Sequence, residues 1–430
     1  MIVIRRRALG VILISFFFLI AFFCTRYLNR PRIRLGEHLI YLNYRAQINP
    51  QKTYYLKCWD YQWPGVDGES WYQQYITSVI KDFEKENPNI KVDLCLLDFQ
   101  SGPQVFSKAL ASGEAPDVYC SAYNIPEFNY EWQIPVGVFL KPQEVNVYYH
   151  GLTKLLSLEK HQLTLPRWTA PGIWIGNRTL MEKAGLNVER IQKQGWSWGD
   201  LLNIRQKTEP ICVGNFSANG LLTQLLSVDD SETQGNNPSV LEFIKYINGP
   251  VPQKFDYEVY MLPLFLAGKT MFLGGVRPII YDFIKRKATE GRIPWEAVLL
   301  PVPSKKPGGI ILPVECGVIG IYRHRNTGGD DQLVAATRLA YYLSNCLQTE
   351  PWERLKVVPA VPAIAENWAK NLGESYSYLI QWLNEAEIYS PKISQDYQGK
   401  VYPGLKSFLN GNISRPEMEN LIKECYFDKD

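Results

Sequence analysis

The stretch from Thr53 to Cys120 constrains the fold of this 430-residue chain more than any other. Apolar runs at 53–60, 90–97 and 117–122 alternate with stripes of apolar residues at helical spacing, at 71–83 and 105–110. Consecutive strand–helix–strand units require a parallel sheet, and ligands bind such sheets outside the carboxyl ends of the strands. We therefore expect an α/β fold, with 90–97 as a buried parallel strand, and a functional site where the strands end.

The chain length and the net charge limit the kinds of protein that this sequence can encode. A chain of 430 residues suits two lobes better than one core. The net charge of +3 is small, and much of the basic excess lies in the first 34 residues, so no nucleic-acid footprint is expected. The 12 Trp and 26 Tyr suit a cleft that stacks on flat apolar faces, although bulky packing between lobes accounts for part of them.

Motifs for metal binding and catalysis are missing from the sequence. The eight cysteines are irregularly spaced without a Cys-x-x-Cys pair, and the four histidines do not have metal-ligand spacing. We expect Cys58, Cys95 and Cys120 to be small buried side chains in strands. Pro263 stands where a phosphate loop ending in Gly268-Lys269-Thr270 would need glycine. We expect no metal, no cofactor and no enzymatic activity, although counting acidic residues does not exclude a glycosidase pair.

The N-terminus predicts export. Arg5–Arg7 precede an uncharged run from Ala8 to about Thr25, which is between a signal-peptide core and a minimal membrane span in length. Three outcomes stay open: an uncleaved anchor, lipid modification at Cys24, or simple cleavage. We expect an extracytoplasmic protein that is tethered to the membrane or secreted, with 1–34 as signal or anchor and basic flank, and 35–52 as a linker.

Polar and aromatic residues follow the first strand at its carboxyl end. They combine indoles, a phenol, a carboxylate and an amide, which together can stack on a sugar ring and bind its hydroxyl groups. The candidate ligand-binding residues here are Trp59, Asp60, Tyr61, Gln62 and Trp63. For Trp59 the alternative is packing between sheet and helix.

The third strand ends in a second set of candidates. Tyr123 and Asn124 lie at its cleft end and are expected to contact ligand. Asp117 comes at the start of the same strand, directly after Pro116, and we expect it to anchor the strand rather than to bind ligand.

Six segments together resemble the extracellular solute-binding proteins of ABC transporters, specifically the maltodextrin-like family called family 1. They are LKCWD (56–60), DFEKENPNIKV (82–92), ALASGEAPDV (109–118), LPRWTAPGIWIGNRTLMEKAGL (165–186), WSWGDLL (196–202) and FLAGKTMFLGG (265–275). The resemblance implies a two-lobed, periplasmic-binding-protein-like fold of type II, each lobe a sheet flanked by helices, with a hinge between them. It implies a first lobe of 53–172 with 316–360 and a second of 173–315 with 361–430.

The resemblance also implies ligand-binding residues in the second half of the site. Trp168 and Trp174 flank the entry to the second lobe and are candidate stacking surfaces. Gly275 and Arg277 fall in a segment that often reads Gly-Gly-Pro-Trp in the family, so that Arg277 replaces a stacking Trp. A guanidinium can still stack and donate hydrogen bonds; either the ligand is partly anionic, or stacking has moved elsewhere.

The function implied is that of the substrate-binding component of an ABC importer. Such a protein closes on a carbohydrate or sugar-like solute in an interlobe cleft and delivers it to permease subunits in the membrane. We expect a monomer that does not bind nucleic acid. Two alternatives stay open: a membrane-anchored sensor domain that presents ligand to a receptor, and a glycan-cleaving enzyme.

Overall fold

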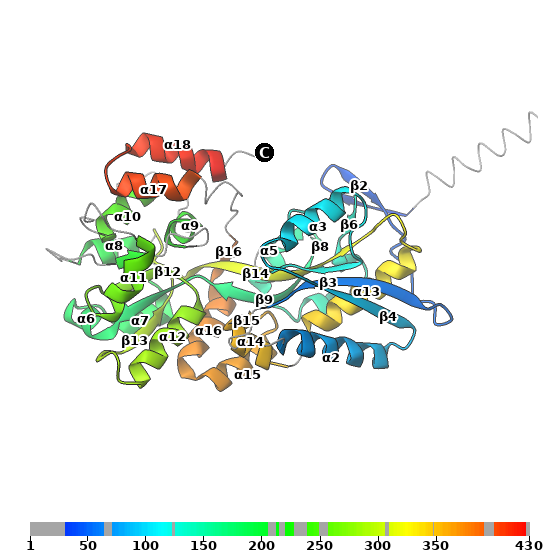
Figure 1. Ribbon diagram of the computed structural model, residues 1–430, viewed down its shortest axis with the longest axis horizontal. Coiled ribbons are helices and arrows are strands. Elements are labelled where there is room, and N and C mark those ends of the chain that lie inside the picture. Colours follow the sequence, from blue (N-terminus) through cyan, green and yellow to red (C-terminus); the bar gives the residue numbers. More distant parts are fainter. Residues whose placement is uncertain are drawn as a thin grey trace, which may run out of the picture.

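The computed structural model describes residues 31–63, 71–122, 125–204, 212–214, 220–227, 239–248, 257–305, 309–346, 348–390 and 400–426. Two groups of helices lie at opposite ends of an elongated molecule, and long strands run between them (Figure 1). The strands form an eight-stranded and a four-stranded sheet, with helices packed on both. This confirms the expected two-lobed α/β architecture.

The larger sheet has the strand order β15-β9-β14-β5-β3-β4, and β6 and β16 also pair with β14. β3 is parallel to both β4 and β5, as strand–helix–strand units require, whereas β14 is antiparallel to β5 and β9. The bounds are β3 (Tyr54–Tyr61), β4 (Ile90–Leu97), β5 (Val118–Cys120), β6 (Gln133–Ile134), β9 (Leu165–Pro171), β14 (Ile311–Tyr322), β15 (Val358–Pro359) and β16 (Glu387–Tyr389).

Helices cover both faces of this sheet. In Figure 1, α2 (Trp71–Glu86) and α13 (Asp330–Ser344) lie below it and α3 (Gly102–Ala111) lies above it. Of the apolar stripe predicted for α2, Ile76, Val79, Ile80 and Phe83 are buried, whereas Trp71 and Tyr75 are only partly buried and Tyr72, outside the predicted stripe, is buried as well. The expectation of a wholly buried strand at 90–97 is wrong, because β4 is an edge strand in which Cys95 is exposed. Cys58 and Cys120 are buried as expected.

The smaller sheet has the order β11-β12-β10-β13. Its strands are β10 (Ile173–Asn177), β11 (Cys212–Gly214), β12 (Phe272–Val276) and β13 (Ala297–Leu300). The helices of this end are α6 (Arg178–Lys183), α7 (Val188–Gln194), α8 (Trp198–Leu202), α9 (Leu221–Ser227), α10 (Val240–Asn248), α11 (Tyr257–Leu266), α12 (Pro278–Thr289), α17 (Tyr402–Leu409) and α18 (Arg415–Tyr426). At the start of α8, Ser197 and Asp200 form a capping box.

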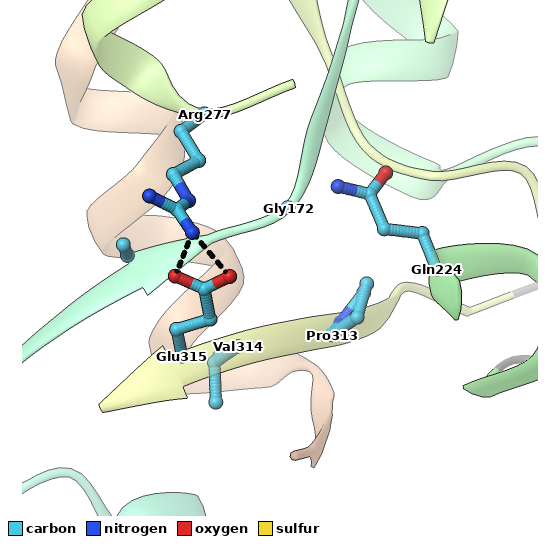
Figure 2. Close-up of a pocket in the computed structure, with 7 residues that line it drawn as sticks. Gly172, Gln224, Arg277, Pro313, Val314 and Glu315 are labelled. Atoms are coloured by element: carbon cyan, nitrogen blue, oxygen red, sulfur yellow. Dashed lines mark hydrogen bonds and ion pairs between the residues drawn. The ribbon is translucent and has the colours of Figure 1, made fainter. Parts of the chain in front are cut away.

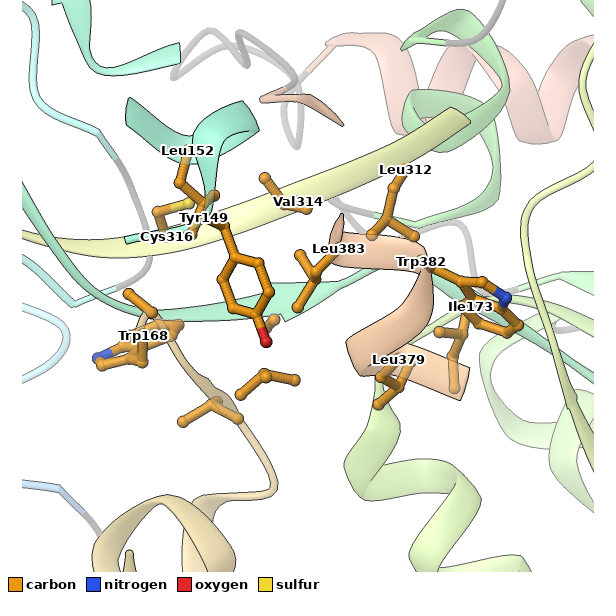
Figure 3. Close-up of a cluster of buried hydrophobic side chains, with 14 of the residues drawn as sticks. Tyr149, Leu152, Trp168, Ile173, Leu312, Val314, Cys316, Leu379, Trp382 and Leu383 are labelled. Atoms are coloured by element: carbon orange, nitrogen blue, oxygen red, sulfur yellow. The ribbon is translucent and has the colours of Figure 1, made fainter. Parts of the chain in front are cut away.

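The two sheets meet at Gly172, which separates β9 from β10. On the return, the chain leaves the smaller sheet at β13 and enters the larger one at β14. Buried apolar side chains continue across this junction, where β9, β14 and α16 (Ser377–Glu385) pack together (Figure 3). On α16, Trp382 donates from Nε1 to the Gln192 carbonyl of α7 at 2.7 Å. The exact lobe boundaries stay a prediction.

The remaining elements connect these layers. They are α4 (Pro142–Val145), α5 (His150–Leu155), β7 (Ser157–Leu158), β8 (His161–Gln162), α14 (Glu350–Leu355), α15 (Pro362–Leu372) and two short 3₁₀ turns, Val136–Val138 and Glu374–Tyr376. α14 precedes β15, whereas α15 and α16 follow it and bring the chain alongside both sheets (Figure 1).

The segment expected to be a linker at 35–52 contains part of a folded hairpin. β1 (Arg32–Leu35) pairs with β2 (His38–Tyr41) around Gly36, whose φ of 59° favours glycine. Leu35 is completely buried in the main core. Further along, the Lys52 ammonium lies 2.7 Å from the Asp331 carboxylate on α13. The apolar residues on either side of Gly36, at 33, 35 and 39–42, are the sequence signal that a linker assignment overlooks.

Candidate functional site

Asp60, at the carboxyl end of β3, is the centre of a buried ionic network. Its Oδ2 accepts from Arg167 Nη1 at 2.7 Å and from the Tyr72 hydroxyl at 2.6 Å, and its Oδ1 accepts from the Tyr61 backbone N–H. Asp60 and Arg167 are 1% and 3% exposed. Burial acts to lower the pKa of Arg167, but the Asp60 carboxylate, with smaller contributions from Tyr72, Cys120 and Tyr75, outweighs burial and the pKa is raised. The expectation that Asp60 contacts ligand is therefore corrected: it neutralises a buried arginine.

Tyr61 lies on the opposite face of β3, beneath α3. Its hydroxyl is 2.7 Å from that of Tyr119, and the Tyr119 ring stacks on Phe106 at a centroid distance of 3.6 Å. Burial raises the pKa of both tyrosines. Because Tyr61 is 1% exposed, it belongs to this aromatic cluster and not to a ligand surface, which corrects a second expectation.

The indole rings of Trp63 and Trp168 pack against each other. Their centroids are 5.5 Å apart in an edge-to-face arrangement, and Trp63 also contacts Phe99 and Tyr72 at 4.8 and 6.2 Å. Trp63 is 2% exposed, and Trp168 is completely buried. Stacking on a solute needs an exposed ring face. The placement of these two residues on a cleft surface is therefore wrong in this structure.

Trp174 lies in β10 and is also buried. Its ring meets those of Trp196 and Phe272 at 5.6 and 6.1 Å, so that it packs under the smaller sheet. Gly275 has a φ of 72°, which favours glycine, and lies inside β12 where its pairing with β10 is irregular. The prediction that Trp174 stacks on ligand is corrected, and Gly275 acts here through its backbone.

The other strand-end candidates differ in their placement. Trp59 and Gln62 are partly exposed, and Trp59 packs against the cluster around Tyr61. Tyr123 and Asn124 lie outside the described residues. Trp59 and Gln62 thus stay candidates for ligand contact.

Asp117 has the structural role expected of it. Its Oδ2 accepts from the Lys57 backbone N–H on β3 at 2.8 Å, and its Oδ1 accepts from Gln332 Nε2 on α13 at 2.6 Å. It therefore ties β5 to the neighbouring strand and to the helix that covers it.

Arg277 is brought to a small pocket at the junction of the two sheets. The pocket is lined by Ala170, Gly172, Gln224, Arg277, Pro313, Val314 and Glu315 (Figure 2). β12 and the start of α12 position Arg277, while β14 positions Glu315. The interior volume is about 10 Å³, close to that of one water, so a larger solute requires the walls to move apart.

An ion pair joins the two sheets across this pocket. Arg277 Nη2 lies 2.6 Å from both carboxylate oxygens of Glu315. The Glu315 side chain is 8% exposed and that of Arg277 35%. Opposite the pair, Gln224 projects from α9 toward Gly172 (Figure 2). The sequence analysis did not identify Glu315 or Gln224. Glu315 is the one carboxylate in the apolar strand 311–322. A single charged residue in an apolar strand is a signal that could have identified it.

Within the residues that the structure describes, no three His, Cys, Asp or Glu side chains are grouped to hold a metal ion. None of the helices in these ranges is sufficiently long and apolar to cross a membrane, and the apolar run at 8–25 lies outside them.

Comparisons with known proteins add independent information. The sequence profile of the family described as bacterial extracellular solute-binding protein matches residues 68–288, just over half of the chain. No curated protein sequence matches significantly.

Solved structures of solute-binding proteins share the fold. A family 1 extracellular solute-binding protein from Bifidobacterium longum subsp. infantis has a TM-score of 0.61 and 14% identity, over 87% of this chain and 98% of that one. The sugar-binding protein MalE from Xanthomonas citri has a TM-score of 0.60 and 16% identity, over 86% and 96%. An ABC substrate-binding protein from Listeria monocytogenes in complex with cycloalternan has a TM-score of 0.55 and 15% identity, over 87% and 99%.

Proposed function

Because the chain belongs to the bacterial extracellular solute-binding protein family, we propose that it captures a carbohydrate or sugar-like solute for an ABC importer. The site is the crevice at the junction of the two sheets. One observation carries the proposal: Arg277, Glu315 and Gln224 converge there from elements of both sheets. The neighbours that bind a sugar or are seen with cycloalternan support the choice of ligand class.

The proposed mechanism is conformational. A solute that contacts both lobes stabilises the closed arrangement over the open one, because its contacts are complete only when the lobes approach. The permease subunits then distinguish loaded from empty protein by this difference. The protein acts as a monomeric binding component, and it performs no chemistry on the solute.

Membership of an extracellular family places the protein outside the cytoplasm. We propose further that the apolar run at 8–25 is retained as a tether, since no small-residue cleavage site follows it. Mature protein should then stay in membranes after a high-salt wash and keep its original N-terminus. N-terminal sequencing that begins beyond residue 25 would contradict retention of the tether, but not solute binding.

A ligand screen tests the proposed function. Full-length protein in detergent is heated with a panel of neutral and acidic mono- and oligosaccharides, with amino acids and short peptides as controls. A true solute raises the melting temperature increasingly as its concentration exceeds Kd, because it binds the folded state alone. Stabilisation by at least one saccharide supports the proposal. Stabilisation by amino acids or peptides alone contradicts it.

A further inference from the structure

Arg277 alone suggests a site that attracts anions, but the charge of its guanidinium is shared with Glu315. Both carboxylate oxygens lie 2.6 Å from Nη2, and Oε1 accepts a charge-assisted hydrogen bond from it. The carboxylate is almost completely buried, so its field is weakly screened by water. An anionic solute group that approaches Arg277 therefore also meets the negative charge of Glu315.

The polar groups that face the pocket include acceptors on both sides. Gln224 is 2% exposed, and its Oε1 has no hydrogen-bond donor among the described residues. Its Nε2 is directed to the Val276 carbonyl at 3.4 Å. A buried amide oxygen needs a donor, and a solute hydroxyl can supply one, whereas an ionised carboxylate is an acceptor alone.

From this arrangement we infer that Glu315 determines the charge specificity of the site. By neutralising Arg277, it selects uncharged, hydroxyl-rich solutes and rejects those that carry a carboxylate at the same position. Gln224 acts with it by accepting from a solute hydroxyl. The inference rests on the proposed function, since it concerns the solute class of the same crevice. Of the two alternatives left open by Arg277, it favours the uncharged ligand.

The experiment compares matched solutes and matched variants. Neutral saccharides are each paired with the counterpart in which one CH₂OH group is oxidised to a carboxylate, and Kd is measured by calorimetry on full-length protein. For at least one pair, wild type should bind the neutral saccharide more tightly than its uronate by a factor of about ten or more. A hydrogen bond to a charged group contributes enough free energy for a factor of this size. Glu315→Gln should reduce this preference to near unity or reverse it, because Arg277 is then no longer neutralised.

Two further variants separate the effect of the Arg277 and Glu315 charges from that of the Gln224 hydrogen bond. Gln224→Leu should weaken neutral saccharides and narrow the ratio of neutral to uronate affinity only in part, because it removes an acceptor that a hydroxyl satisfies and a carboxylate does not, while the ion pair of Arg277 with Glu315 is kept. Arg277→Gln should widen the ratio, because the Glu315 charge then remains without its cation. This second variant keeps the test decisive if Glu315→Gln does not fold, as monitored by the melting temperature without ligand.

The outcomes distinguish the inference from the proposed function. Equal or tighter binding of uronates by wild type, or an unchanged ratio in both Glu315→Gln and Arg277→Gln, overturns the inference while solute binding stands. If no saccharide of either kind binds wild type or any variant, the proposed function is itself contradicted, and the inference falls with it.

Discussion

Replacing Trp63 with alanine tests where the aromatic residues at the end of β3 lie. The indole is 2% exposed and is surrounded by the rings of Phe99, Trp168 and Tyr72 at 4.8, 5.5 and 6.2 Å. Truncating a fully buried Trp costs about 3–5 kcal/mol, through the lost burial and the cavity that remains. Domains are typically stable by about 5–15 kcal/mol, so we expect a large fraction of the free energy of unfolding to be lost.

The assay is urea unfolding of full-length protein in detergent, followed by far-ultraviolet circular dichroism. Trp63→Ala should lower the unfolding midpoint strongly, and Trp63→Phe, which keeps an aromatic ring among its neighbours, should lower it clearly less. Solute affinity of the folded fraction should change little in Trp63→Phe. An unchanged midpoint in Trp63→Ala, together with weakened solute binding, would place the ring in the cleft and refute its assignment to the core.

Two further predictions concern ionic contacts. Asp60→Asn should lower the free energy of unfolding by about 3–5 kcal/mol, because it leaves Arg167 buried without its counter-charge; an Asp60→Asn midpoint equal to that of wild type would refute this. Burial raises the pKa of Asp331, but hydrogen bonds from Lys52 and Tyr54 outweigh burial and the pKa is lowered. The ionised Asp331 carboxylate therefore stabilises the folded state above the ordinary Asp pKa of about 3.9. This stabilisation is lost as pH falls through the lower pKa that Asp331 has in the folded state. Wild type should exceed Asp331→Asn in stability by up to about 1 kcal/mol near neutral pH and converge with it in acid unfolding; a constant difference would argue against this ion pair.

Local patterns in the sequence predicted the first lobe well. The apolar stripe at 71–83 became the buried face of α2, because a helix on a sheet must bury one side. At the end with the smaller sheet, two helices begin with a capping-box pair, a local pattern of two side chains three residues apart. Ser197 with Asp200 begins α8, and at Ser414 both the backbone N–H and the hydroxyl donate to Glu417 before α18.

The strand-end residues were predicted less well, because burial there depends on distant parts of the chain. Asp60 is covered through Arg167 of β9, which lies 107 positions later, and Tyr61 through α3. A strand covered on both faces buries both sets of alternating side chains, so polarity at its end does not imply exposure. Arg277 was identified through the family resemblance, whereas its partner Glu315 became evident only when β14 was placed beside it.

Small-angle scattering with and without solute tests the central claim most directly, namely that a saccharide bound between the lobes closes them. Full-length protein is measured empty and then saturated with the saccharide that stabilises it most in the thermal screen. The account predicts a smaller radius of gyration in the saturated sample, with Glu315→Gln showing the same compaction for whichever saccharide it binds. A saturating saccharide that raises the melting temperature and leaves the radius of gyration unchanged would contradict closure.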